Sequence, residues 1–188
     1  KRCGLVSELH VSNCRIGDEG LKQIADVCCQ SSSSSSPPPF LNRSFLHRLD
    51  LSHNDLTAAG VAHLAEQLHR LIDGDGAPSQ IDQQCILSGL RALSLADNPL
   101  DESFATIFDR APRWISSLEE LDLSRSQCGI RSAVELIRPN ASANSNSNSN
   151  SSLLKRLILF GNELGSDDGF GELAKVLEGG HPSVEYLD

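Results

Sequence analysis

The sequence predicts an α/β solenoid, in which a curved parallel β-sheet lines the concave side and helices cover the convex side. Three observations lead to this prediction. A short strand-like pattern recurs along the chain, a helical apolar pattern follows each copy, and copies without an insertion between them are about 28 to 30 residues apart. Neither a lone short strand nor a single amphipathic helix can bury its apolar face, so neighbouring units must stack around a shared core.

The strand-like segment follows the pattern L-x-x-L-x-L-x-x-N-x-L. Three copies match at every position and begin at Leu46, Leu90 and Leu154. Near matches begin at Val6 and Leu118, and a truncated sixth copy begins at Val184. Because each full copy fixes several positions, the pattern indicates true repeats rather than chance.

The asparagine of each copy ends the strand, where its side chain can hydrogen-bond backbone groups of the turn from one coil to the next. Cys14 and Ser126 occupy this position in the near matches and are weaker hydrogen-bonding groups. The register of the fourth unit stays open at this stage. Its residues 128–130 would also align with residues 14–16 after a two-residue insertion.

An apolar set spaced 0, 3, 4, 7 follows the strand of most units, which is the pattern of one helix face. We expect these side chains to be buried, unit by unit: Leu21, Ile24, Ala25 and Cys28; Val61, Leu64, Ala65 and Leu68; Phe104, Ile107, Phe108 and Ala111; Ala133, Leu136 and Ile137; Phe170, Leu173, Ala174 and Leu177.

The repeats form one expected domain over residues 1–188, with five repeats and a truncated sixth. Low-complexity insertions at about residues 30–44, 72–86 and 139–152 account for the longer units. They offer almost no apolar surface to offset the entropy of ordering, so we expect them to be disordered. All three follow a helix and precede a strand. They should therefore project from one edge and leave the concave face and the opposite edge clear.

The strand-to-helix repeat, the Asn/Cys position and the G-x-x-x-L-A helix pattern resemble the ribonuclease-inhibitor-like class of leucine-rich repeats. That class includes ribonuclease inhibitor, the Ran GTPase-activating protein and the repeat arrays of NOD-like receptors. The resemblance covers the chain apart from the three insertions. It implies a leucine-rich-repeat solenoid that serves as a protein-binding surface.

Composition narrows the classes of partner. The formal charge of −9 disfavours nucleic acid as the main partner, because phosphate binding depends on clustered Lys and Arg. No apolar run approaches the roughly 20 residues of a membrane helix, and no secretory leader is visible. We therefore expect cytoplasmic residence, with the nucleus as an alternative. The chain contains no Met, so we expect it to be part of a longer protein.

The cysteine and histidine patterns do not indicate chemistry. The six cysteines are scattered, which favours reduced and mostly packed thiols over disulfides or metal ligands. No histidine lies in an H-E-x-x-H pattern, and neither a G-x-S-x-G motif nor a phosphate-binding glycine loop occurs. We expect no enzymatic activity, no catalytic residues, no metal and no cofactor.

The candidate site is the concave face, because residues flanking the buried leucines of a strand point outward. Its expected partner-binding residues are Glu8, His10, Arg48, Asp50, His53, Asp97, Glu120, Asp122, Arg125, Arg156, Ile158, Phe160 and Tyr186. The face is mixed in charge and mildly acidic, and it becomes apolar at its C-terminal end. The aromatic residues beside Arg156 there are typical of a binding hot spot, although they could also cover the end of the array.

The leading hypothesis is an interaction scaffold that binds a protein partner of unknown identity through this face. One alternative is a GTPase-activating regulator resembling the Ran activator, for which Arg15 in a strand-to-helix loop is weak evidence. Another is the sensor array of a larger NOD-like receptor. The fold alone does not choose among these, since one solenoid fold supports many functions.

Overall fold

A computed structural model describes residues 6–29, 46–72, 85–137, 153–164, 167–178 and 186–187. Most of the three expected insertions lie outside these residues. At the edges of the second one, helix α2 extends to Ile72 and a 3₁₀ turn begins at Ile86. Whether the insertions are disordered thus stays a prediction.

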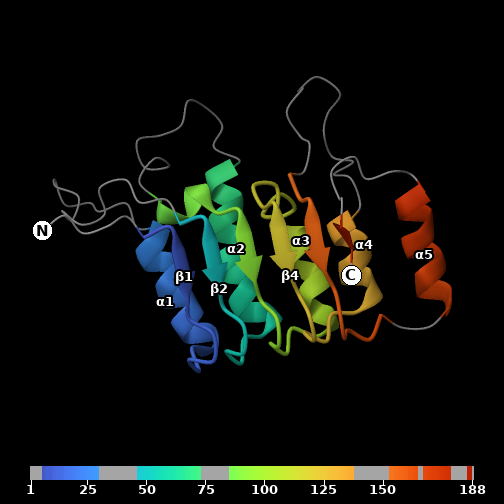
Figure 1. The fold of residues 1–188 in the computed structure, drawn as a ribbon, viewed down its shortest axis with the longest axis horizontal. Coiled ribbons are helices and arrows are strands. Elements are labelled where there is room, and N and C mark those ends of the chain that lie inside the picture. The colour runs from blue at the N-terminus through green and yellow to red at the C-terminus, as the bar shows by residue number, and fades with distance from the viewer. Residues whose placement is uncertain are drawn as a thin grey trace, which may run out of the picture.

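The structure confirms the predicted solenoid, because six parallel strands form one sheet in chain order. The strands are β1 (Glu8–His10), β2 (Arg48–Asp50), β3 (Ala92–Ser94), β4 (Glu120–Asp122), β5 (Arg156–Ile158) and β6 (Tyr186–Leu187). The central leucine of each strand pairs in register with the next, from Leu9 to Leu187. Each repeat therefore contributes one equivalent strand (Figure 1).

The helices lie together on one side of this sheet (Figure 1). They are α1 (Gly17–Cys29), α2 (Ala58–Ile72), α3 (Ile107–Arg110), α4 (Ile130–Ile137) and α5 (Asp167–Glu178). The 3₁₀ segments η2 (Ile86–Gly89) and η3 (Glu102–Thr106) complete the convex layer. The other side of the sheet, called the concave face below, carries none of the described helices (Figure 1).

The core lies between strands and helices and consists mostly of the repeated leucines. Leu49, Leu93 and Leu121, at the strand centres, are at most 1% exposed. The predicted faces of α1 and α2 pack against them, and Val61 and Leu64 are fully buried. In α1, Ile24 and Cys28 are only half-buried, because among the described residues α1 packs against α2 on one side alone.

The third unit departs from the expected α-helix. It folds as a 3₁₀ segment followed by only one α-helical turn, and Ala111 already has non-helical backbone angles. Pro112 follows, and the residue before a proline is disfavoured in the helical region. Phe104 is nevertheless buried as expected and packs edge-to-face on the fully buried Trp114, with ring centroids 6.1 Å apart. Trp114 is a core residue that the repeat pattern did not identify.

The fifth unit corrects one expected core position. Ala174 of α5 is exposed, whereas the equivalent Ala25 and Ala65 are fully buried. Among the described elements α5 packs against α4, and no helix lies on its other side. Leu173 is 8% exposed and supports the predicted face. The side chains of Phe170 and Leu177 lie outside the description.

The register of the fourth unit follows the uninterrupted pattern. Leu121 pairs with Leu93 and Leu157, and the backbone N–H of Ser126 donates to Asn162, as Asn54 does to Asn98. Ser126 therefore occupies the asparagine position. The alternative alignment with a two-residue insertion is wrong.

Candidate protein-binding surface

The register of the sheet arranges the outward side chains in rows that cross the strands. One row contains Glu8, Arg48, Ala92, Glu120, Arg156 and Tyr186. The next row contains His10, Asp50, Ser94, Asp122 and Ile158. Because parallel neighbours are about 4.8 Å apart, side chains in one row are close enough to interact directly.

Arg48 and Glu120 form an ion pair across an intervening strand. The Nη2 of Arg48 lies 3.2 Å from Oε2 of Glu120, and its Nη1 lies 3.4 Å from the other oxygen. Ala92 stands between them in the row, and its methyl group leaves room for the arginine to pass over. This pair holds two candidate binding residues in fixed positions.

A serine fixes the orientation of each aspartate in the second row. The hydroxyl and backbone N–H of Ser52 donate to Oδ1 of Asp50 at 2.7 and 3.0 Å. Ser124 makes the same two bonds to Asp122 at 2.6 and 2.9 Å. Burial alone would raise the pKa of Asp50, but the bonds from Ser52 and His10 outweigh it, so that pKa lies below its ordinary value.

The turn after each of the strands β1 to β5 carries a residue in the left-handed backbone region. These residues are Asn13, His53, Asp97, Arg125 and Gly161, with φ between 50° and 71°. Such angles are uncommon for residues other than glycine. Their recurrence at one position of each coil shows that the turn is the same in five repeats.

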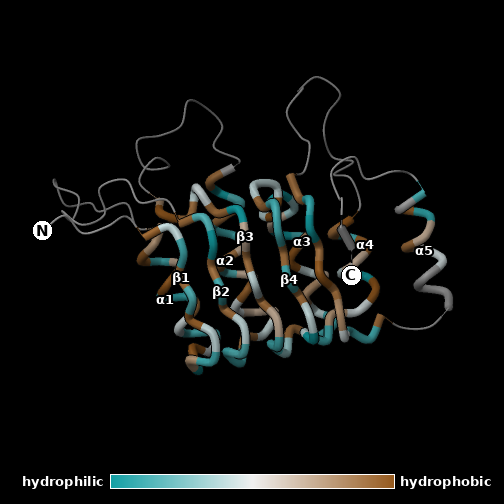
Figure 2. Tube along the Cα trace, viewed as in Figure 1, coloured by the Kyte–Doolittle hydropathy of each residue, from teal (hydrophilic) through white to brown (hydrophobic). Residues whose placement is uncertain are grey.

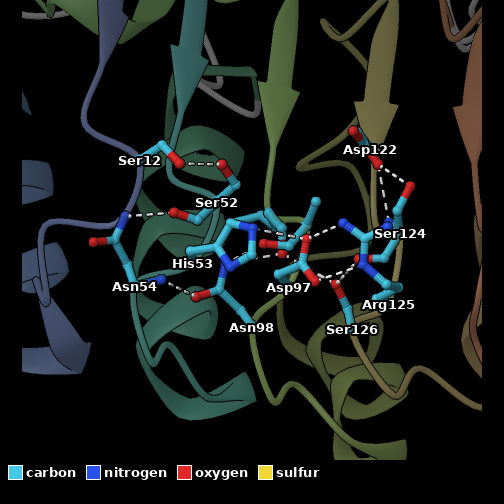
Figure 3. A network of polar contacts seen from close by, with 12 residues as sticks. Ser12, Ser52, His53, Asn54, Asp97, Asn98, Asp122, Ser124, Arg125 and Ser126 are labelled. Atoms are coloured by element: carbon cyan, nitrogen blue, oxygen red, sulfur yellow. Dashed lines mark hydrogen bonds and ion pairs between the residues drawn. The ribbon is translucent and has the colours of Figure 1, made fainter.

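Asp97 is the centre of a polar cluster on this row of turns. Arg125 donates through Nε and Nη2 to its two oxygens at 2.6 and 2.5 Å, and Nε2 of His53 lies 3.1 Å from Oδ2 (Figure 3). The hydrogen bond from Arg125 holds the pKa of Asp97 below its ordinary value. Gly161 lies beneath Arg125, since a Cβ there would be 2.7 Å from Cγ of Arg125.

A ladder of buried asparagines supports these turns from below. The amide oxygen of Asn54 accepts the N–H groups of Cys14 and Ile16, at 2.9 and 3.3 Å. Asn98 accepts the corresponding groups of Asn54 and Leu56, at 2.9 and 3.1 Å (Figure 3). The predicted coil-to-coil role of asparagine is confirmed, and the bonds run to the preceding coil.

The C-terminal part of the concave face is apolar. Phe160 is 57% exposed, and Ile158 is half-buried on the neighbouring row. Figure 2 shows the strand beyond β4 as hydrophobic, whereas β4 itself is mostly hydrophilic. The side chain of Tyr186 lies outside the described residues, so its contact with Phe160 stays a prediction.

The structure brings together most of the candidate residues in three groups. Arg48 contacts Glu120; His53 and Arg125 contact Asp97; and His10 lies 3.5 Å from Glu8 and 3.4 Å from Asp50. Sequence reasoning did not assign Ser52 and Ser124 their role as aspartate donors. The repeated Asp-Leu-Ser tripeptide at 50–52 and 122–124 was the available signal.

Sequence reasoning also missed a contact in the convex layer. Nε2 of His63 on α2 lies 2.7 Å from Oδ1 of Asp26 on α1. This pair links neighbouring helices and adds a polar bridge to their packing. No sequence motif indicates it, because the two residues are 37 positions apart.

Two other features, a metal site and a membrane-spanning helix, are absent from the described ranges. There, no group of three or more His, Cys, Asp or Glu residues could hold a metal ion. The helices within these same ranges are too short or too polar to cross a membrane.

Comparison with known families agrees with the repeat pattern. The family model described as "Leucine Rich repeat" matches residues 5–25 and 44–65. These segments cover the strand, the asparagine or cysteine turn and the first helical turns of two units. Over these two segments the chain is similar to the leucine-rich-repeat family.

A solved structure from Caenorhabditis elegans, the tropomodulin C-terminal domain, is similar to this chain at 14% sequence identity. The match covers 92% of this chain and 83% of that chain, with a TM-score of 0.47. No curated protein sequence matches the chain.

Proposed function

We propose that this chain binds a partner protein through its concave strand face, as a scaffold of the ribonuclease-inhibitor-like class. Leucine-rich-repeat domains generally mediate interactions between proteins. The helices of this domain all lie on the convex side, which leaves the strand face uncovered in the described part of the chain (Figure 1).

The observation that carries the proposal is the fixed orientation of the carboxylates on this face. Ser52 and Ser124 hold Asp50 and Asp122, and Arg125 holds Asp97. A surface whose polar groups are already ordered loses less conformational entropy on binding than a surface of free side chains. The face is thus suited to a partner of defined shape and charge.

We expect a partner with cationic groups that face β2 to β4 and an apolar group that contacts the C-terminal end of the concave face. Asp50 accepts hydrogen bonds from Ser52 and lies within hydrogen-bond distance of His10. Asp122 accepts hydrogen bonds from Ser124. Serine donors leave each carboxylate its negative charge, so lysine or arginine of a partner complements it. Phe160, exposed and aromatic, is the type of residue that anchors an interface.

Affinity capture with quantitative mass spectrometry tests the proposal. Proteins retained by the wild-type chain are compared with those retained by Asp50→Lys, Asp122→Lys and Phe160→Ala. We expect each change to reduce the retention of one and the same protein by about tenfold or more, since hot-spot truncations cost about 2 kcal/mol.

Matched controls place the same changes on the helix side. Asp109→Lys on α3 reverses an exposed charge, and Val27→Ala on α1 truncates an apolar side chain that is 63% exposed. Both should retain the partner, and circular dichroism should show that all variants stay folded. Equal retention by the concave variants and the controls would exclude this face as the binding surface.

We also propose cytoplasmic residence, with the nucleus as the alternative, because the resemblance is to intracellular repeat arrays. A fluorescent fusion of the full-length protein tests this. Accumulation outside both compartments would contradict it.

A further inference from the structure

Two cysteines from different coils meet within the helix layer. Cys29 is the last residue of α1, and Cys85 directly precedes η2, 56 positions further along the chain. Their Sγ atoms are 2.8 Å apart. Bonded sulfurs lie about 2.05 Å apart, so a movement of less than about 1 Å separates this contact from a covalent bond.

The surroundings make Cys29 the more accessible partner. Cys29 is half-buried, whereas Cys85 is only 4% exposed. The hydrogen bond to Cys85, followed by burial, raises the pKa of Cys29, and burial raises the pKa of the adjacent Cys28 to about 11. These thiols are therefore protonated at neutral pH, which slows their oxidation without preventing it.

We propose that Cys29 and Cys85 are a redox modification site, at which a low-molecular-weight disulfide of the glutathione type oxidises the pair to an intramolecular disulfide. The thiolate of Cys29 attacks one sulfur of the small disulfide, which forms a mixed disulfide and releases one small thiol. The thiolate of Cys85 then attacks Sγ of Cys29 and releases the second small thiol. The two protein sulfurs lose two electrons, which reduce the small disulfide, and both thiol protons end on the released thiols.

The bond would tie the first coil to the start of the third and enclose the whole second repeat. Such a bond restricts the unfolded chain across a long loop, which stabilises the folded state. Oxidation would therefore stabilise the N-terminal half of the solenoid, including the strands that carry Glu8, His10, Arg48 and Asp50. This site is independent of the proposed binding function, because it lies in the helix layer.

The test uses the purified full chain in buffers of defined reduced and oxidised glutathione ratio, followed by alkylation and peptide mapping. We expect a Cys29–Cys85 cross-linked peptide and a rise in Tm of roughly 5–10 °C, both reversed by dithiothreitol. The rate of bond formation should increase from pH 7 to pH 9, since the thiolate is the attacking species.

Cys28→Ser is the matched control and should keep both the cross-link and the Tm shift. Cys85→Ser should lose both the cross-link and the Tm shift. If that variant folds poorly, the difference in Tm between oxidised and reduced wild type still tests the proposal. Glutathione adducts alone, dimers, or a Cys28–Cys85 cross-link would overturn the site. A Cys29–Cys85 bond without a change in Tm would overturn its stabilising role.

Discussion

The third and fourth coils close the same turn with different side chains. Asn98 accepts two N–H groups from the preceding coil and donates to three carbonyls, those of Leu51, Leu95 and Ala96. Ser126, in the equivalent position, donates to the carbonyls of Leu95 and Ser124.

The backbone supplies part of what the serine lacks. The N–H of Leu100 donates to the backbone carbonyl of Ser126 at 3.0 Å, where the equivalent Leu56 uses the side chain of Asn98. Both Asn98 and Ser126 are at most 1% exposed, so unpaired backbone groups around them would be costly. This position therefore requires hydrogen-bond partners for the buried backbone groups, and a residue other than asparagine can help to supply them.

The largest expected loss of stability comes from removing the side-chain amide of Asn98. Asn98→Ala leaves two N–H groups and up to three carbonyls without this partner in a buried site, and we expect a loss of about 3–4 kcal/mol in the free energy of unfolding. Urea unfolding measures it. A loss below about 1 kcal/mol would show that water or the backbone replaces the amide, and would remove the distinction between the two coils.

Gly161 tests whether the left-handed turn is equivalent in every coil. It has φ of 71°, and an added Cβ would contact Cγ of Arg125. We expect Gly161→Ala to cost about 2 kcal/mol, from backbone strain together with displacement of Arg125. Thermal unfolding checks this. Unchanged stability would mean that the fifth turn accepts a side chain as the other four do.

The serine position should show a smaller effect than its asparagine counterpart. Ser126→Ala removes one hydroxyl donor, and we expect a loss of about 1 kcal/mol in urea unfolding. The backbone bond from Leu100 to residue 126 is retained in this variant. A cost equal to that of Asn98→Ala would indicate that the hydroxyl has the full role of the amide.

The smallest effect concerns pH and the Asp97 cluster. Because the pKa of Asp97 is lowered in the folded state, its contribution is complete above the unfolded pKa of about 4 and is lost as pH falls through the folded value. The partner Arg125 is exposed, so solvent screening keeps this contribution small. Asp97→Asn should therefore lose less stability than wild type between pH 5 and pH 2. Parallel curves would show that the ion pair adds nothing.

The candidate surface was predictable where it depends only on the alternation of side chains between the two faces of a strand. Placement of Asp50 and Asp122 on one face needs only the alternation of strand side chains. The pairing of Arg48 with Glu120 was not predictable, since it depends on the small size of Ala92 on the strand between them. The left-handed turns were also missed, although asparagine, histidine, aspartate and glycine, which favour positive φ, hold four of the five positions.

The sequence by itself determined the repeat, the parallel strand order and the leucine core, because each unit must bury its apolar residues against the next. It determined the role of asparagine for the same reason, since a buried turn needs a polar partner in every coil. Only the tertiary structure decided which residues from separate coils meet. The contacts of Asp26 with His63 and of Cys29 with Cys85 depend on how helices and turns align in space. Such contacts join residues far apart in the chain, and a local sequence pattern cannot predict that these residues lie close together in space.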